Sequence, residues 1–217
     1  MRLEHKKKYL QIALNSSFSE AREILFNLPV SDRILIEAGT PLIKSEGANV
    51  IREIKFLKPY SYIVADLKIM NLAKKEVILA KKNGADAVVC LGFAPIETID
   101  EFIRLCEEYQ MDSMLDMMSV KNSLLVLKKL KKPPNVVILH RGADETENRE
   151  KLIPYYQIKQ IQGALNNVLI SVAGGDELSE IRSAIFNGVD ILILWKAFYH
   201  PGAEISVLAN KFLKEIQ

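Results

Sequence analysis

The chain has 217 residues, of which 49% are hydrophobic, so it can bury a full core, and we expect residues 1–217 to form a single domain. Lys and Arg number 29 against 27 Asp and Glu, and this small net charge of +2 argues against nucleic-acid binding or a polybasic membrane anchor. No segment is apolar for long enough to be a membrane span or a signal sequence, so we expect a cytoplasmic protein.

Short apolar runs alternate along the chain with longer amphipathic stretches. In the amphipathic stretches apolar residues recur at three-to-four spacing, as in Ile99, Phe102, Ile103 and Cys106, which is typical of helices packed on one face. A last helix is predicted over residues 204–216. The predicted strands are residues 10–14, 33–38, 62–67, 87–91, 113–117, 136–140, 168–172 and 191–194.

This alternation predicts a parallel sheet that is covered by helices, because such strands are buried on both faces. An open doubly wound sheet usually has a glycine-rich phosphate turn after its first strand, whereas here the first run leads into Asn15-Ser16-Ser17-Phe18. The sequence therefore favours a compact α/β fold, the (β/α)8 or TIM barrel with parallel strands. The similar turns at residues 83–86 and 187–190 look like one repeat unit used twice.

Polar residues follow the predicted strands at their carboxyl ends. In a (β/α)8 barrel these ends meet at one mouth, where the chemistry is found. The alternative is that chains simply become polar where they leave a core. The residues are Asn15, Glu37, Asp66 with Lys68, Asp116, His140 with Arg141, Gly174 with Gly175, and Lys196.

Glu37 and Asp66 are candidate ligands for a magnesium ion. Glu37 lies within an apolar run, where a carboxylate needs a cation, and Asp66 ends the next strand. Two carboxylates at one mouth can seat Mg²⁺, which takes its other ligands from water and substrate. Lys68 lies two residues after Asp66, and extended geometry would point both side chains the same way. An Asp-Lys ion pair without a metal explains the spacing equally well.

A phosphate site is suggested after the seventh strand. Gly174 and Gly175 would let backbone N–H groups approach an anion, although a tight turn explains them too. Lys196 could add a charge to the same phosphate or face solvent. His140 could be a packed residue, or a proton shuttle if it faces the mouth.

These positions together resemble the orotidine 5′-phosphate decarboxylase superfamily. Within it the chain is most similar to the branch of 3-hexulose-6-phosphate synthase and 3-keto-L-gulonate-6-phosphate decarboxylase. The resemblance covers nearly the whole chain. It rests on LQIALN (residues 10–15), IEAGTPLIKSEG (36–47), ADLKIMN (65–71), GADAVVCLG (84–92), HRGADE (140–145) and AGG (173–175).

The resemblance implies a Mg²⁺-dependent lyase that joins ribulose 5-phosphate to formaldehyde through an enediolate. It also implies a homodimer with active sites completed across the interface. The implied roles are metal ligands (Glu37, Asp66), stabilisation of the enediolate oxygen (Lys68), proton transfer (His140) and phosphate binding (Gly174, Gly175, Lys196). Asp66, Asn71 and Arg141 are placed with Lys68 and His140 in the catalytic group, and Asn15 and Asp116 are placed in substrate binding.

The chain departs from the family pattern at three places. The pattern Asp-x-Lys-x-x-Asp ends here in Asn71, and the first strand ends in Asn15 instead of Asp. An amide keeps the shape of the acid but cannot act as a base. Trp195-Lys196 replaces Gly-Arg after the last strand, which adds bulk near the phosphate. The alternative function is thus a catalytically degraded relative that binds a sugar phosphate or a protein partner without turnover.

Overall fold

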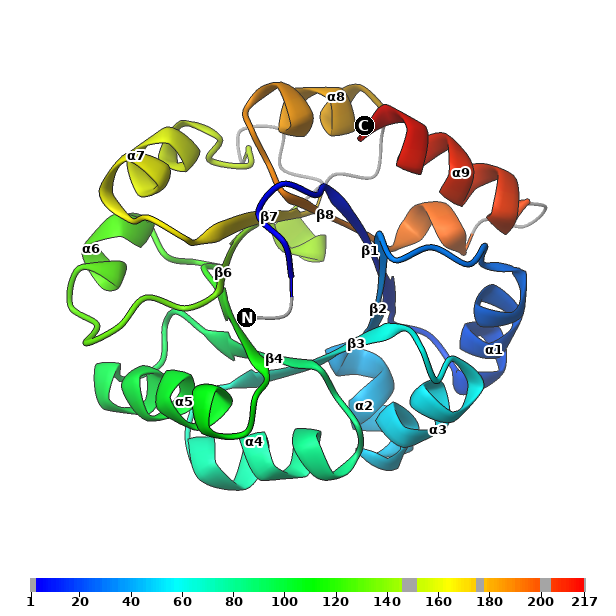
Figure 1. Ribbon diagram of the computed structural model, residues 1–217, viewed down its shortest axis with the longest axis horizontal. Helices are drawn as coiled ribbons and strands as arrows, with labels where there is room; N and C mark the ends of the chain where they lie inside the picture. The colour runs from blue at the N-terminus through cyan, green and yellow to red at the C-terminus, as the bar shows by residue number, and fades with distance from the viewer. Residues whose placement is uncertain (1–2, 146–151, 175–177, 200–203, 217) are drawn as a thin grey trace.

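The computed structural model describes residues 3–145, 152–174, 178–199 and 204–216. Eight parallel strands close into a barrel in chain order, with helices around it (Figure 1), so the predicted (β/α)8 fold is confirmed. The strands are β1 (Tyr9–Leu14), β2 (Ile34–Ala38), β3 (Tyr62–Ile69), β4 (Ala87–Leu91), β5 (Asp112–Asp116), β6 (Val136–His140), β7 (Leu169–Ala173) and β8 (Ile191–Leu194). Most predicted boundaries lie within one residue of these, and β3 is two residues longer than predicted.

The helices cover the outside of the barrel. They are α1 (Phe18–Asn27), α2 (Thr40–Glu46), α3 (Asn49–Leu57), α4 (Ala73–Lys82), α5 (Ile96–Glu108), α6 (Ser123–Leu127), α7 (Tyr156–Ala164), α8 (Leu178–Phe186) and α9 (Ile205–Glu215). Short 3₁₀ helices, η1 (Ala143–Glu145) and η2 (Lys196–Phe198), follow β6 and β8. Within the described ranges, each helix is too short or too polar to cross a bilayer.

Side chains alternate between two apolar cores because successive residues of a strand face opposite ways. In β1, Leu10, Ile12 and Leu14 pack outward against the helices. Tyr9 and Ala13 point inward, into a second cluster that fills the barrel. The two cysteines, Cys90 and Cys106, are free and buried in the outer core.

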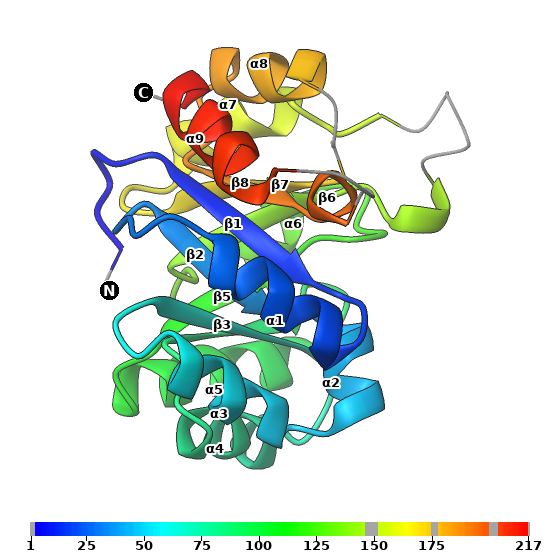
Figure 2. The same ribbon diagram turned by 90° about the vertical axis from the view of Figure 1, so that its right-hand side faces the viewer.

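The N-terminal segment closes the amino end of the barrel. It lies across the ring of strands in Figure 1 and at the end opposite the arrowheads in Figure 2. Leu3 is buried in the inner cluster, and its N–H donates to Asp112 Oδ2 (3.3 Å). The same oxygen accepts a hydrogen bond from the Tyr62 hydroxyl (2.7 Å). With this end filled, a ligand can enter the barrel from the carboxyl ends of the strands.

The turn at residues 83–86 connects α4 to β4 and ties it to β3. Gly84 has a φ of +86°, a left-handed value that glycine adopts without strain. Asp86 Oδ2 then accepts hydrogen bonds from the N–H of Ile63 and from Lys55 Nζ, both at 2.9 Å. One carboxylate therefore joins two strands and helix α3.

The turn at residues 187–190 repeats this arrangement four strands later. Gly188 has a φ of +83°. Asp190 Oδ2 accepts from the N–H of Ile170 (2.8 Å), and Asp190 Oδ1 pairs with Lys8 Nζ (2.8 Å). The likeness that the sequence shows between the two turns is thus a likeness of structure as well.

We predict that Asp86→Ala lowers the free energy of unfolding by about 1–3 kcal/mol, because it leaves the buried N–H of Ile63 without this partner. Asp32→Ala is the matched control, since Asp32 pairs with a lysine on the exposed surface. Urea unfolding followed by circular dichroism would measure both variants. Equal losses in the two would contradict this role for Asp86.

Candidate active site

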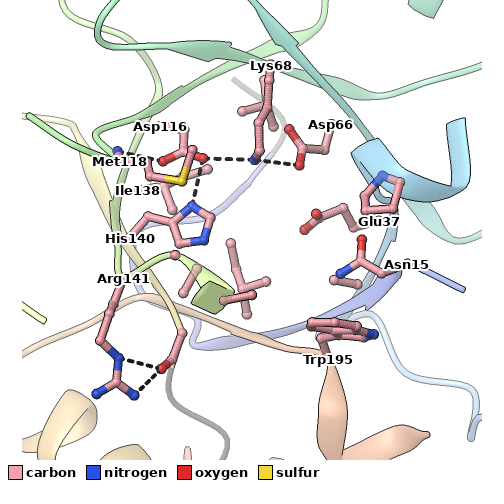
Figure 3. Close-up of a pocket in the computed structure, with 18 of the residues that line it drawn as sticks. Asn15, Glu37, Asp66, Lys68, Asp116, Met118, Ile138, His140, Arg141 and Trp195 are labelled. Carbon is pink, nitrogen blue, oxygen red and sulfur yellow. Dashed lines mark hydrogen bonds and ion pairs between the residues drawn. The ribbon is translucent and has the colours of Figure 1, made fainter. Parts of the chain in front are cut away.

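A cavity of about 260 Å³ opens at the carboxyl ends of the strands, where the sequence places the active site. Because side chains alternate between the two faces of each strand, every second residue points into the barrel and can line this cavity. Inward positions near the ends of β2, β3, β5 and β6 are occupied by Glu37, Asp66, Asp116 and His140. Each follows an inward apolar residue two positions earlier, such as Leu35 before Glu37. The charged side chains at the mouth (Figure 3) therefore lie next to the apolar residues that fill the inside of the barrel.

Lys68 lies between two carboxylates in this cavity (Figure 3). Its Nζ is 2.8 Å from Asp66 Oδ2 and 3.1 Å from Asp116 Oδ2. His140 Nδ1 is 2.8 Å from the same oxygen of Asp116. The other oxygen of Asp116 accepts from the N–H of Met118 (2.9 Å). One connected network thus joins β3, β5 and β6.

The backbone of β3 departs from regular strand geometry at Lys68. Lys68 has a φ of +46°, and the pairing of β3 with β4 shifts register between Ala65 and Ile69. The predicted pairing of Lys68 with Asp66 is present, but the extended geometry assumed for it is wrong. A left-handed lysine costs on the order of 1 kcal/mol or more, which the two ion pairs offset. Thr40 Oγ1 fixes the segment further by donating to the backbone oxygen of Asp66 (2.8 Å).

Glu37 is buried beside this network without a cation of its own. Gln11 Nε2 donates to Glu37 Oε2 (2.5 Å) from the neighbouring strand β1. Burial, together with the negative charge of Asp66, raises the pKa of Glu37 to about 7. Gln11 is a site residue that the sequence patterns do not identify, although a polar residue at an inward position of an apolar strand is a signal that could have found it.

The pKa values of the other ionisable groups in the network are shifted so as to favour their charged forms. Burial alone would raise the pKa of Asp116, but the hydrogen bond from His140 and the charges of His140 and Lys68 lower it to about 2. Burial acts against the charge of Lys68, yet Asp66 and Asp116 raise its pKa above the usual range. The pKa of His140 is raised because the hydrogen bond to Asp116 and its charge outweigh burial.

The network, with Glu37 beside it, therefore contains three carboxyl groups and two groups that can be cationic. They are Glu37, Asp66 and Asp116, and Lys68 and His140. If Lys68 and His140 carry full charges, they balance Asp66 and Asp116, and Glu37 is the surplus acid. Moreover, Asp66 Oδ1 is buried and has no hydrogen-bond partner among the described residues. An unneutralised carboxylate beside an unsatisfied carboxylate oxygen fits a hard divalent cation.

In such a metal site the protein would supply two carboxylate ligands, Glu37 and Asp66. Across the described ranges of the chain, no group of three or more His, Cys, Asp or Glu side chains has metal-binding geometry. A magnesium ion would therefore take its remaining ligands from water and substrate, as Mg²⁺ commonly does.

The predicted phosphate site lies around the loop after β7. Gly174 has a φ of +97°, and a Cβ there would overlap the backbone oxygen of Arg141. The Arg141 side chain donates to the Gly174 carbonyl through Nε (3.2 Å) and Nη2 (2.5 Å), which holds the guanidinium at the cavity edge. Lys196 is exposed and also lines the cavity. Gly175 lies outside the described residues.

Asn15 and Trp195 form the opposite side of the cavity from His140 (Figure 3). A Cβ at Gly39 would overlap Asn15 Oδ1, so glycine at that position is what admits the amide. The Lys196 Nζ lies 5.8 Å from the centroid of the Trp195 ring. Of the predicted substrate-binding residues, Asn15 and Asp116 therefore both reach the site.

Asn71 is the described candidate that the structure does not bring into the cavity. It lies exposed on the loop after β3, and its Oδ1 accepts a hydrogen bond from the N–H of Leu72 (2.8 Å). Its membership of the catalytic group therefore stays a prediction, and Asn71 does not line the cavity of its own chain.

Comparison with known proteins identifies the same family that the sequence motifs resemble. The family model described as "Orotidine 5′-phosphate decarboxylase / HUMPS family" matches residues 8–193. The chain is 36% identical over 212 residues to the "Bifunctional enzyme Fae/Hps" of Methanocella arvoryzae, with 96% of this chain and 53% of that protein covered. The chain thus spans about half the length of the curated relatives it matches.

Solved structures show the same fold. The 3-hexulose-6-phosphate synthase of Salmonella typhimurium is 28% identical, with a TM-score of 0.86 over 96% of this chain and 98% of that one. The 3-keto-L-gulonate-6-phosphate decarboxylase of Vibrio cholerae has a TM-score of 0.76 at 18% identity, over 97% of this chain and 99% of that one. The latter likeness supports the fold alone.

We predict that the free energy of unfolding falls as the pH rises from about 4.5 to about 7, because folded Glu37 holds its proton up to the higher value. The contribution of Glu37 is at most about 3 kcal/mol. Glu37→Gln removes it, so the variant should become more stable than the wild type as the pH rises. Any contribution from His140 is common to both proteins. Urea unfolding in chelator at pH 5 and pH 8 measures the difference, and parallel pH profiles would contradict it.

Proposed function

Because this chain belongs to the orotidine 5′-phosphate decarboxylase / HUMPS family, we propose that it is a Mg²⁺-dependent lyase acting on a phosphorylated ketose. The reaction we assign is the joining of ribulose 5-phosphate and formaldehyde, as in 3-hexulose-6-phosphate synthases. The observation that carries this is Lys68, a half-buried cation fixed between Asp66 and Asp116 at the mouth of the barrel. Such a cation is suited to stabilise an oxyanion.

Glu37 and Asp66 would hold the magnesium ion. When bound, the ion would supply Lewis-acid polarisation of the substrate oxygens. The surplus charge of Glu37 and the unsatisfied Asp66 Oδ1 support this assignment.

Lys68 would stabilise the enediolate that forms when the ketose loses a proton. Its two carboxylate partners keep the ammonium charged and aimed, so it need not reorganise as the negative charge develops. The enediolate carbon then forms a bond to the carbon of formaldehyde. The aldehyde oxygen takes up a proton, which completes the new hydroxyl group.

His140 would carry the proton in this sequence. Its Nδ1 is held by Asp116, which fixes the ring and leaves Nε2 for the substrate. The raised pKa favours the protonated imidazole, which is the form that can donate a proton. Removal of a proton from the ketose requires the neutral ring instead.

The phosphate would lie at the β7 and β8 loops, with Gly174, Arg141 and Lys196 around it. The left-handed Gly174 lets the backbone approach an anion, and the two side chains supply positive charge at the cavity edge. This places the phosphate across the mouth from Lys68.

A second candidate is a ligand-binding relative without turnover. The two amides favour it: Asn15 lines the cavity where the family pattern has an acid, and Asn71 cannot act as a base. Synthase activity that appears only in an Asn71→Asp variant would establish this alternative, since the scaffold would then be intact and the reaction lost.

We further propose that the chain forms a homodimer in which the loop after β3 reaches the site of the second subunit. Met70, Leu72 and Phe93 are exposed apolar side chains on the loops after β3 and β4, beside the cavity. Asn71 lies among them and outside the cavity of its own chain. An apolar patch that flanks a catalytic mouth is suited to a subunit contact.

We predict that the protein converts ribulose 5-phosphate and formaldehyde in the presence of Mg²⁺. Lys68→Ala should lower kcat/KM by about 100-fold or more, because the oxyanion loses its charge partner. Lys74→Ala, an exposed lysine on α4, is the matched control and should be neutral. A coupled assay of formaldehyde consumption measures all three proteins, and inactivity of folded wild-type protein would count against the proposal.

We predict a molecular mass in solution of twice that of the chain, as measured by light scattering on a sizing column. Leu72→Asp should produce monomers and lose activity in parallel, because a charge is placed in the contact. Leu125→Asp changes an equally exposed leucine on α6 and should remain dimeric. A monomeric wild type with full activity would refute the shared site.

A further inference from the structure

The cavity has a charged half and a neutral half. Its charged inward side chains come from β2, β3, β5 and β6. The inward residues of β7, β8 and β1 are instead apolar or uncharged: Ala173, Ile193 with Trp195, and Ala13 with Asn15. Apart from Arg141 and Lys196 at the cavity edge, a ligand held by the charged half therefore meets uncharged side chains on this neutral half.

Trp195 is the largest side chain of the neutral half. It follows Ile191 and Ile193 at the same inward alternation and packs against the inner barrel core from above. The indole is half-buried and lines the cavity, and Figure 3 shows it across the opening from His140 and Asp116. Support from these apolar residues fixes the ring in place as a wall of the cavity.

This wall limits the space for a ligand. The cavity of about 260 Å³ is below the range of roughly 300–1,000 Å³ that is usual for small-molecule sites. The side chains of the charged half are held in place by ion pairs, so they are not free to move aside for a larger ligand. The indole of Trp195 is therefore the largest side chain that limits how long or broad a ligand can be.

We propose that Trp195 is a specificity-determining residue that restricts the site to compact, acyclic phosphate esters and excludes ring-bearing ones such as nucleoside 5′-monophosphates. The inference rests on the proposed function in one respect, that a phosphorylated ligand occupies this cavity. It does not require turnover. Trp195 is the one tryptophan of the chain and lines the cavity, so intrinsic fluorescence is a direct probe of a ligand bound beside it.

The test compares ribulose 5-phosphate with uridine 5′-monophosphate as ligands of the wild type, Trp195→Ala and Trp195→Phe. In the wild type, ribulose 5-phosphate should raise the melting temperature and change the indole emission, and the nucleotide should do neither. Trp195→Ala and Trp195→Phe have no tryptophan, so their binding is measured by melting temperature and by isothermal titration calorimetry. In Trp195→Ala the nucleotide should bind, with a Kd at least about tenfold lower than in the wild type. Trp195→Phe keeps a large ring and should retain the wild-type preference.

Phe186→Ala, an exposed aromatic of α8 that does not line the cavity, is the matched control and should not alter ligand preference. If Trp195→Ala does not fold, as judged by circular dichroism, Trp195→Leu carries the same prediction. Nucleotide binding to the wild type, or unchanged preference in a folded small variant, overturns the proposal. Failure of both ligands to bind any variant overturns it as well. Binding with the expected preferences but without turnover removes the synthase assignment and leaves Trp195 in its role.

Discussion

The site depends on one ammonium group held between two buried carboxylates. Lys68 lies between Asp66 and Asp116, and none of the three could be buried in ionised form without the others. The network requires a closed barrel, because its members come from strands that are not all adjacent. It also requires the irregular backbone of β3, where Lys68 adopts a left-handed conformation to place its Nζ between its partners.

In this network one carboxylate, that of Glu37, has no cation of its own to balance its charge. Glu37 is as buried as Asp66 but has an amide, Gln11, where the others have a cation. Burial and the charge of Asp66 raise its pKa, and the shortage of positive charge beside it makes the pair of Glu37 and Asp66 a fitting seat for a divalent ion. The electrostatic cost in the free protein and the capacity to bind a metal thus have one physical origin.

The neutral half of the cavity differs in character from the charged half. Trp195 and Asn15 stand opposite the network that the proposed reaction uses, and they alter the space and hydrogen bonding offered to the ligand while the charged half stays intact. Asn71 lies outside the cavity of its own chain, on the exposed loop after β3. In the proposed function, the chemistry and the selection of ligand are therefore assigned to different strands of one barrel.

The sequence by itself determined the barrel and the residues at its mouth. Eight apolar runs with helical spacing between them leave few ways to cover a parallel sheet, and period-two alternation assigns Glu37, Asp66 and His140 to the inside. Only the tertiary structure decided which of these residues touch. Sequence spacing could not show that Lys68 bridges to Asp116 on β5, that Gln11 supports Glu37 from β1, or that Asn71 stays outside. Local pattern fixes which face a side chain is on, whereas contacts across the mouth depend on barrel closure and on a bulge that no local pattern marks.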